Sequence, residues 1–553
     1  MIAQNFIKEY IEKSLQENWN SPAFSDYQGK TIPFSTVAKD VVRIHQMLEM
    51  WGIKPGDKVA LVGRNSSSWA TSYLAIISYG AVVVPVLADF AVADIHHIIN
   101  HSDSKILFTS DQIWENIDES SMPHLTAIFS LTQFNLLVSR NDDATNQLKS
   151  EVDNLTKKLE ELTPNDINFR EISNDKLGVI SYTSGTTGFS KGVMLPLNSL
   201  AANVLFGHNN IPLQAGDKIV SFLPLAHAYG CAFEFLWPFS VGCHITFLTK
   251  TPAPKTIIQA FEQVRPKLIL TVPLIMEKIY KKQILPTLNK QPMKLLLNVP
   301  LLDKKIYQQI NKKLSEVFGG NFMQVIIGGA PLNSEVEDFL KKIKFPFTVG
   351  FGMTECGPLI SYAAWADNPQ GACGKILPTL SVKIDSADPF VEVGEIMVKG
   401  ENVMMGYYKN PEATNSAITS DGWLRTGDLG LIDSENYIYI KGRSKSMILG
   451  PSGQNIYPEE IEAKLNNMPY IQESLVVEKN NRLVALIYPD YETADEAGLN
   501  AEDLALIMEE NKKILNSVLP AFMQIQKTKL YPEEFEKTPK KSIKRFLYLS
   551  VEI

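Results

Sequence analysis

Predicted strands and helices alternate in the first part of the chain, and this order strongly limits the fold. A helical pattern covers Val37 to Trp51, a Pro-Gly-Asp turn follows at residues 55–57, and an apolar strand is expected at Lys58 to Val62. A second helix around Trp69 to Ser78 precedes a strand at Ala81 to Val86. Such units form mostly parallel sheets covered by helices, so we expect an α/β fold.

The pattern changes toward the end of the chain, which suggests a second domain. With 553 residues, the chain exceeds the size at which one hydrophobic core usually divides. Short strands and Gly-rich turns fill residues 394–442. Helical patterns at 458–466 and 502–518 then enclose two strand patterns. We expect a large domain of mostly parallel, helix-covered sheets at 1–442 and a small α+β domain at 443–553.

Composition excludes several classes of protein. The net charge of −8 gives no general attraction for nucleic acids. The four cysteines form no C-x-x-C pair, which argues against a zinc or redox site. The N-terminus lacks the basic region and apolar core of a signal peptide. The most apolar run, residues 74–88, is too short to cross a bilayer. We expect a cytoplasmic protein, with contact at the membrane periphery left open.

A charged segment with regularly spaced leucines lies at residues 142–166. Its apolar positions are Leu148, Val152, Leu155, Leu159 and Leu162. The spacing of four and three predicts an amphipathic helix on the protein surface. The alternative is a coiled-coil partner site, for which the repeat is short.

A strand at Leu177 to Tyr182 leads into a loop suited to phosphate. The loop reads Thr183, Ser184, Gly185, Thr186, Thr187, Gly188, Phe189, Ser190, Lys191, Gly192. Its glycines allow close backbone approach, its hydroxyl groups can bond phosphate oxygens, and Lys191 adds a charge. It is no Walker A loop, because Gly192 follows Lys191. A plain Ser/Thr/Gly linker is the alternative, but linkers rarely follow a buried strand in this way.

The segment from Tyr182 to Gly192 resembles the phosphate loop of the superfamily of AMP-forming acyl-CoA synthetases, adenylation domains and luciferases. Ser190 stands where a proline is common. Further motifs follow in the family's order, and the likeness is strongest to long-chain fatty acid–CoA ligases. It implies a mobile small domain and the use of ATP, Mg²⁺ and coenzyme A.

Two motifs are similar to the family's nucleotide-binding segments. The adenine-side loop corresponds to Gly328 to Leu332, which includes Gly329, Ala330 and Pro331. The aromatic-Gly-x-Thr-Glu motif corresponds to Phe351, Gly352, Met353, Thr354 and Glu355. The resemblance implies that Phe351 stacks on adenine, that Thr354 contacts the α-phosphate and that Glu355 holds Mg²⁺. A Thr-Glu pair alone would more often be a helix N-terminus.

Later motifs resemble the ribose site, the hinge and the coenzyme A loop. Asp428 corresponds to the ribose clamp, Arg443 to a ribose or phosphate contact, and Lys445 to the pivot between domains. Gly450 and Gly453 correspond to a loop that meets the pantetheine arm in the family. A turn between two strands is the other interpretation of this loop.

Two segments bear on the acid substrate. Residues 271–280 resemble a segment of long-chain acyl-CoA synthetases, although Leu274 stands where arginine is frequent. In the apolar segment 222–248, the resemblance implies that His227 flanks the acyl carboxylate. This segment could line an alkyl tunnel or pack in the core, and a lone histidine is more often a core residue.

The C-terminal segment departs from the family pattern. Aligning it on Ile543, Lys544 and Arg545 puts Ser542 where the family has a catalytic lysine. We expect Lys541 to fill that role, because a long side chain can absorb an offset of one residue. Lys540 and Lys544 are weaker substitutes, and a solvated basic tail is the plain alternative.

The resemblance implies that the chain activates a long-chain fatty acid to acyl-AMP and passes it to coenzyme A. Two alternatives remain. One is a fatty acyl-AMP ligase that loads an acyl carrier protein, and the other is a weakly active lipid-binding relative. A domain that adenylates aryl or amino acids fits the 271–280 segment less well.

Overall fold

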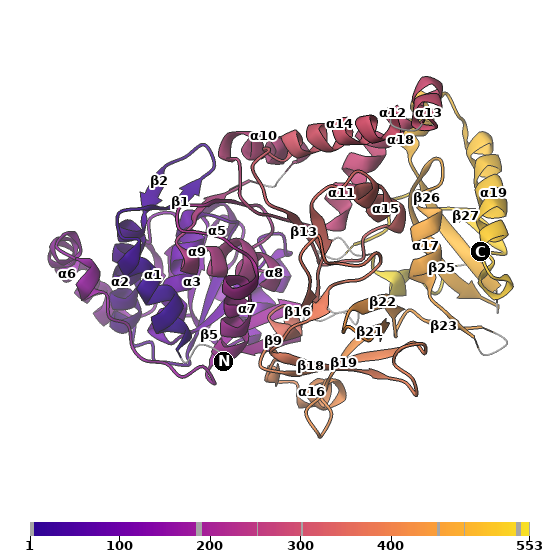
Figure 1. The fold of residues 1–553 in the computed structure, drawn as a ribbon. Coiled ribbons are helices and arrows are strands. Elements are labelled where there is room, and N and C mark those ends of the chain that lie inside the picture. The colour runs from indigo at the N-terminus through magenta and orange to yellow at the C-terminus, as the bar shows by residue number, and fades with distance from the viewer. Residues whose placement is uncertain are drawn as a thin grey trace.

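The computed structural model describes residues 5–183, 191–250, 253–299, 302–450, 454–480, 482–537 and 543–551. Helix-covered sheets form a large body, and the C-terminal portion lies at one end of it (Figure 1). The expected α/β fold class, with a small α+β portion at the end of the chain, is confirmed.

The largest sheet has eight strands and carries the predicted phosphate loop. Strands β3, β4, β5, β6 and β8 run parallel, and β8 pairs with β9 in the antiparallel sense. In spatial order the strands are β20 (Gly406–Tyr407), β9 (Lys191–Pro196), β8 (Leu177–Thr183), β4 (Val82–Val86), β3 (Lys58–Val62), β5 (Ser104–Thr109), β6 (Ala127–Ser130) and β7 (Leu136–Ser139). Every residue of β4 is buried, as its continuous apolar sequence predicts.

Helices cover this sheet, and capping residues mark where they begin and end. The Ser66 hydroxyl accepts the Trp69 amide at 3.2 Å at the start of α3, and Gly80 ends that helix with φ +92°. The run at 74–88 is therefore a buried helix end, a Gly turn and a buried strand. The helices of this part are η1 (Ile7–Glu12), α1 (Lys13–Glu17), α2 (Phe34–Met50), α3 (Ser67–Tyr79), α4 (Val92–His101), α5 (Asp111–Trp114), α6 (Asp142–Glu160) and α7 (Leu197–Asn210).

Helix α6 is the predicted amphipathic surface helix. Leu155 is buried, Leu148 packs against the main apolar cluster, and both line a cavity of about 350 Å³ together with Met47 of α2. The Lys39 ammonium donates to the Glu160 carbonyl at 3.2 Å. The apolar side of α6 therefore packs on this chain, so the interpretation as a surface helix is correct and a coiled-coil partner is not needed to cover it.

A second sheet bears the segment predicted to line the acyl site. It has the order β10 (Lys218–Ser221), β11 (His244–Phe247), β1 (Pro22–Asp26), β2 (Thr31–Pro33). Between β10 and β11 lie α8 (Ala228–Gly230), η4 (Cys231–Leu236) and α9 (Trp237–Val241), whose aromatic residues are largely buried.

A three-stranded parallel sheet carries the adenine-side motifs and a long helical arm. Its strands are β12 (Ile269–Thr271), β13 (Val325–Ile327) and β14 (Phe347–Val349). The helices around it are α10 (Pro254–Val264), α11 (Pro273–Ile279), η5 (Tyr280–Ile284), α12 (Leu285–Leu288), α13 (Gln291–Leu297), α14 (Leu302–Val317) and α15 (Ser334–Lys342).

Antiparallel strands follow, and short strands do occupy the Gly-rich range 394–442, as predicted. One sheet contains β15 (Phe351–Gly352), β16 (Leu359–Tyr362) and β17 (Lys375–Ile376), and the short helix η6 (Thr354–Cys356) lies between its first two strands. The other contains β18 (Leu380–Asp385), β19 (Gly394–Gly400), β21 (Leu424–Ile432) and β22 (Ile438–Arg443), and α16 (Pro411–Ala417) precedes β21.

The C-terminal portion has its own apolar core. The last buried residue of the main cluster of the body is Ile438. Two further clusters contain only later residues: one includes Ile456 with partly buried Ile448, and the other begins at Leu475. The elements are β23 (Ile448–Leu449), β24 (Asn455–Ile456), α17 (Pro458–Leu465), β25 (Ile471–Lys479), β26 (Arg482–Pro489), α18 (Tyr491–Glu496), α19 (Ala501–Val518), η7 (Ala521–Met523), β27 (Lys527–Leu530) and η8 (Arg545–Tyr548). The domain boundary at residue 442 stays a prediction.

Polar groups connect this portion to the body. The Asn333 amide donates to Asn467 Oδ1 at 2.7 Å and to the Ala463 carbonyl at 3.1 Å. Lys282 forms an exposed ion pair with Glu492 at 2.7 Å. The Lys281 ammonium also donates to the Asn466 carbonyl. Polar side chains thus contribute several of the contacts between the two parts.

No helix in the described ranges combines the length and the apolar character that crossing a bilayer requires. All four cysteines are free, and three of them are buried. Buried free cysteines of this kind pack as small apolar residues.

Candidate active site

The phosphate loop connects two paired strands. Thr183 ends β8 and pairs with Lys191 at the start of β9, so the loop begins and ends at one point. That point lies at the carboxyl edge of the parallel strands, where α/β sheets bind ligands. The predicted phosphate ligands Ser184, Gly185, Thr186, Thr187 and Gly188 lie outside the described residues.

Tyr407 connects Lys191 with Glu355. The Tyr407 hydroxyl donates to Glu355 Oε1 at 2.9 Å, and Lys191 Nζ lies 4.9 Å from the centroid of the Tyr407 ring. Burial and the Glu355 carboxylate raise the pKa of Tyr407, so its hydroxyl keeps the proton that it donates. Strand β20 holds the ring in place because Tyr407 pairs with Val193 of β9.

The Thr354–Glu355 turn is fixed from several sides. Thr354 and Glu355 lie in η6, and the Met404 amide donates to the Glu355 carbonyl at 2.8 Å. From α7, the Asn203 amide donates to the Cys356 carbonyl at 3.2 Å. A Cβ on Gly352 would lie 2.3 Å from the Pro358 carbonyl oxygen, so this motif position requires glycine.

Two neighbouring parallel strands deliver the adenine-side motifs. Gly328 follows β13 directly, and its amide donates to the Thr271 carbonyl of β12 at 3.0 Å. Next in the chain, Gly329, Ala330 and Pro331 are exposed, and Gly329 has φ +86°. Gly350 follows β14 and leads to Phe351, whose ring is buried. Both predicted adenine contacts therefore lie at one edge of this sheet.

Asp428 and Arg443 face each other on paired strands. Arg443 Nε lies 3.1 Å from Asp428 Oδ1, and the two residues are register partners in β21 and β22. Burial raises the pKa of Asp428 to about 6, with Arg443 opposing the shift and the Glu355 charge adding to it. The predicted ribose and magnesium carboxylates are thus close enough to influence each other.

The loop that carries His227 is held by two buried side chains. Glu234 Oε2 accepts the Phe222 and Leu223 amides, each at 3.0 Å. Asn65 accepts the Leu225 amide at 3.0 Å and donates to the Leu223 carbonyl at 2.7 Å. His227 itself caps α8 and is only partly buried, unlike an enclosed core histidine.

The predicted hinge and coenzyme A residues follow β22. Lys445 is exposed in the turn after Arg443. Gly450 is buried, and its amide donates to the Gln454 carbonyl at 2.8 Å, while Gly453 lies outside the described residues. Strands β23 and β24, which flank this loop, pair with each other. The role of the loop in binding coenzyme A stays a prediction.

The C-terminal basic segment is anchored in the fold. Both terminal nitrogens of Arg545 donate to the Glu462 carboxylate, each at 2.8 Å, and the Val476 carbonyl accepts a third bond at 3.0 Å. The interpretation as a solvated basic tail is therefore wrong for Arg545. Lys541 and Ser542 lie outside the described residues, and flanking Lys537 and Ile543 form an antiparallel bridge.

A family model described as "AMP-binding enzyme" matches residues 11–408. The chain belongs to the AMP-binding enzyme family. Long-chain-fatty-acid–CoA ligase FadD15 of Mycobacterium bovis is 26% identical over 538 residues, which is 89% of this chain and 86% of the relative. 4-coumarate–CoA ligase 4 of Arabidopsis thaliana is 29% identical over 471 residues, or 81% of this chain and 75% of the relative.

The fold of this AMP-binding enzyme is also found in solved structures. O-succinylbenzoate coenzyme A synthetase (MenE) from Bacillus subtilis, in complex with ATP and magnesium ion, matches with a TM-score of 0.73. The alignment covers 99% of each chain at 19% identity, which supports the assignment of the fold alone.

The donor set of this AMP-binding enzyme suits a cation that also binds phosphate. Among the described residues no group of three or more His, Cys, Asp or Glu could hold a metal. Glu355 therefore offers one oxygen-donor side chain beside the phosphate loop. Mg²⁺ is typically bound in this way, through one or two carboxylates, substrate phosphates and water.

Sequence reasoning missed several residues of this site. Tyr407 lies 52 positions from Glu355, and Asn203 lies 153 positions from Cys356. Neither side chain belongs to the motifs that indicated the site. Glu234 did carry a signal, because it is a carboxylate within an otherwise apolar segment.

Replacing Tyr407 with phenylalanine is expected to weaken magnesium-dependent adenylation about tenfold, the effect of losing a hydrogen bond to a charged group. The ring beneath Lys191 remains, so only the hydroxyl is tested. The readout is the Mg²⁺ concentration that gives half-maximal pyrophosphate exchange. Tyr408→Phe is the matched control, since the Tyr408 hydroxyl donates to Asp103 instead, at 2.8 Å. Equal behaviour of the two variants would remove Tyr407 from the site.

Adenylation should depend on pH through Asp428. Below pH about 6 the protonated carboxyl loses acceptor capacity for ribose hydroxyls. We expect kcat/KM for ATP to rise between pH 5 and about pH 7, because this ratio reports groups of the free enzyme. Asp428→Asn should be about tenfold slower and lack this inflection. Persistence of the same inflection in Asp428→Asn would assign it to another group.

Proposed function

We propose that the chain activates a long-chain fatty acid with ATP to give acyl-AMP and pyrophosphate, and then transfers the acyl group to coenzyme A. Membership of the AMP-binding enzyme family supports the general reaction class of this proposal, namely that the chain is an adenylate-forming acid–thiol ligase. The observation that supports the site is the convergence of Lys191, Glu355 and Asp428 at the loop between β8 and β9.

In the proposed first step, a carboxylate oxygen of the acid attacks the α-phosphorus of ATP, and the bond to pyrophosphate breaks. The carboxylate and the triphosphate are both anions, so the protein accelerates the step mainly by positioning them and by neutralising their charge. Lys191 and Thr354 would orient the phosphates, and Asp428 with Arg443 would hold the ribose. Mg²⁺ bound at Glu355 would neutralise phosphate charge. Lys541 would supply the cation next to the acyl carboxylate.

In the proposed second step, the thiol sulfur of coenzyme A attacks the acyl carbon, the thiol gives up its proton, and AMP leaves with the bonding electrons. One pocket can serve both steps if the small portion turns at Lys445. The Gly450 and Gly453 loop would then meet the pantetheine arm. Gly329, Ala330, Pro331, Phe351 and Gly352 would hold adenine in the first step.

A long aliphatic acid is supported by two features. The segment around His227 is bounded by buried apolar side chains such as Phe222, Ala232 and Phe239. The segment 271–280 is similar to that of long-chain ligases, and a long-chain ligase is among the relatives. The 4-coumarate ligase among them makes an aryl acid the competing substrate class.

Release of AMP across a series of acids tests the proposal. With coenzyme A present, kcat/KM should rise roughly fourfold per added methylene before it levels, the effect of about 0.8 kcal/mol for each buried methylene. Replacing coenzyme A with an acyl carrier protein tests the alternative acceptor. Best activity on acetate, benzoate or coumarate would contradict a long-chain substrate. If no acid supported pyrophosphate exchange, the alternative of a weakly active lipid-binding relative would be favoured.

The two steps should separate at the proposed hinge. Lys445→Pro fixes φ at this position and should hold one orientation of the small portion. We expect acyl-AMP formation within about threefold of wild type and thioester output at least about tenfold lower. Single-turnover assays of each step provide the measurement. Equal loss in both steps would argue against a pivot at Lys445.

A further inference from the structure

A helical arm with strong positive charge projects from the body. This basic arm comprises residues 278–299 and 302–313, from the end of α11 through most of α14, and runs along the top of Figure 1 toward α13. It contains nine lysines and a single acidic residue, Asp303, for a net charge of +8. The whole chain carries −8, so the arm is charged oppositely to the rest of the protein.

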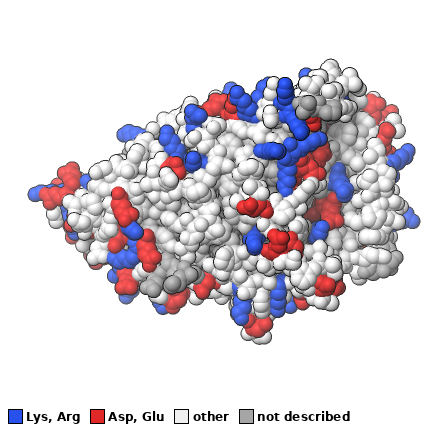
Figure 2. All heavy atoms as spheres, viewed as in Figure 1, with Lys and Arg blue, Asp and Glu red and all other residues white. Residues whose placement is uncertain are grey.

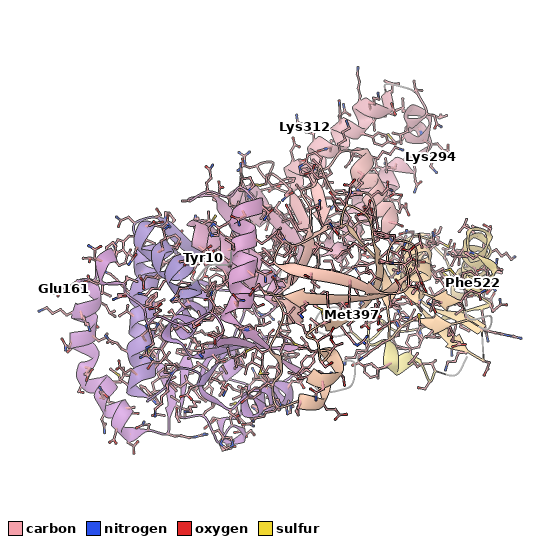
Figure 3. The ribbon with its side chains drawn as sticks, turned by 60° about the horizontal axis from the view of Figure 1, so that its bottom comes forward. Tyr10, Glu161, Lys294, Lys312, Met397 and Phe522 are labelled. Atoms are coloured by element: carbon pink, nitrogen blue, oxygen red, sulfur yellow. The ribbon has the colours of Figure 1, made fainter. Side chains whose placement is uncertain are left out.

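Most of this charge has no ion-pair partner among the residues that the structure describes. Of the exposed lysines of the arm, only Lys282 forms an ion pair with a residue that the structure describes. Figure 2 shows basic side chains beside an uncharged tip at the upper right, and Figure 3 shows Lys294 and Lys312 on the projecting helices. The other exposed lysines, without an ion pair among the described residues, are Lys278, Lys290, Lys294, Lys304, Lys305, Lys312 and Lys313.

Large apolar side chains are exposed at the tip of the same arm. Leu295 is 68% exposed, Leu296 43%, Val299 44% and Leu302 40%. They come from α13, the connection after it and the first residue of α14. We call these four residues the apolar tip. Exposed apolar residues gathered in one place mark an interaction site more often than residues scattered singly.

Lysines around exposed leucines match the chemistry of an anionic lipid surface. Basic side chains pair with lipid headgroups, while apolar side chains enter the boundary between headgroups and acyl chains. An acidic protein would satisfy the lysines but gives no reason for the exposed leucines. Nucleic acid fits still less well, because its phosphates also offer nothing to the apolar tip.

We propose that the basic arm binds the chain to the surface of an anionic membrane, with the apolar tip inserted between the headgroups. Attraction to the surface charge should strengthen binding roughly fivefold for each lysine near the membrane. Salt weakens such attraction, so binding should fall as ionic strength rises. The proposal does not depend on the substrate, since the arm bears none of the proposed catalytic residues.

Sedimentation of the full chain with vesicles tests this surface. We compare phosphatidylcholine vesicles with vesicles that also contain phosphatidylglycerol. The arm variant carries Gln at Lys290, Lys294, Lys304 and Lys305. The matched control carries Gln at Lys30, Lys149, Lys157 and Lys158, which are exposed lysines remote from the arm in sequence. Both variants change the net charge by the same amount. Adenylation of a soluble short acid verifies that each variant is folded.

Wild type should bind the anionic vesicles, and the arm variant at least about 50-fold more weakly. The control should stay within about twofold, because charges beyond the Debye length of the contact are screened. Leu295→Ser with Leu296→Ser should weaken binding about tenfold without changing net charge. The proposal fails if wild type does not bind anionic vesicles, if the control loses as much as the arm variant, or if the arm lysines affect only binding of an acidic carrier protein.

Discussion

Adenylate formation should fall at least about tenfold when Glu355 is replaced by glutamine, the order expected when a group that stabilises charge is lost. Glutamine keeps the shape of the side chain, and its carbonyl can still accept the Tyr407 hydroxyl. It lacks the charge that holds Mg²⁺ beside the phosphates. Pyrophosphate exchange measures the effect, and raising the Mg²⁺ concentration should recover part of the lost rate.

Glu337→Gln provides the control for Glu355→Gln. Glu337 is a buried carboxylate that pairs with Lys341 at 3.3 Å and accepts the Gly371 amide at 2.8 Å, and it belongs to none of the proposed nucleotide-binding motifs. The same chemical change there should leave exchange nearly unaffected. If Glu355→Gln turned over like wild type at low Mg²⁺, this carboxylate could not be the magnesium ligand.

Loss of Arg545 should destabilise the C-terminal portion by about 3–5 kcal/mol, the cost of leaving one charge of a buried pair without its partner. Arg545→Leu removes the two bonds to the Glu462 carboxylate. Burial raises the pKa of Glu462 and the guanidinium opposes this, so the remaining carboxyl would favour the protonated form. Hydrogen exchange of the amides in β25, which lie beside Glu462, measures the local stability.

Two variants distinguish this ion pair from general loss of charge. Lys544→Leu removes the neighbouring ion pair with exposed Glu536 and should cost at most about 1 kcal/mol. Arg545→Leu combined with Glu462→Leu removes both buried charges and should recover much of the stability. Equal protection of the β25 amides in wild type and Arg545→Leu would show that the pair does not hold the segment.

Elements with strong local signals could be predicted from the sequence. Strand β3 has the predicted bounds, because its apolar residues begin directly after the Pro-Gly-Asp turn. Helix α6 begins at Asp142 as its pattern indicates. Motif resemblance also singled out Lys191, Glu355 and Asp428, which the fold places near one another. Their roles stay predictions. These predictions needed only periodicity, turn residues and motif order.

Contacts between distant segments could not be predicted in this way. Arg545 and Glu462 lie 83 positions apart, and a basic C-terminal segment looks the same whether it is anchored or solvated. Tyr407 reaches Glu355 only because β20 joins the edge of the large sheet beside β9. Such pairs depend on which strands become neighbours, and no local pattern in the chain records that.

The contacts that join the C-terminal portion to the body favour easy exchange between arrangements. Asn333 with Asn467, and Lys282 with Glu492, are polar pairs that water can replace when they separate. Each such bond contributes a net of about 0.5–1.5 kcal/mol. Breaking one such bond shifts the population about 2- to 13-fold, which a ligand with about a hundredfold preference for the other arrangement outweighs. On the proposed two-step mechanism, ATP and coenzyme A would each select its own arrangement without unfolding of either core.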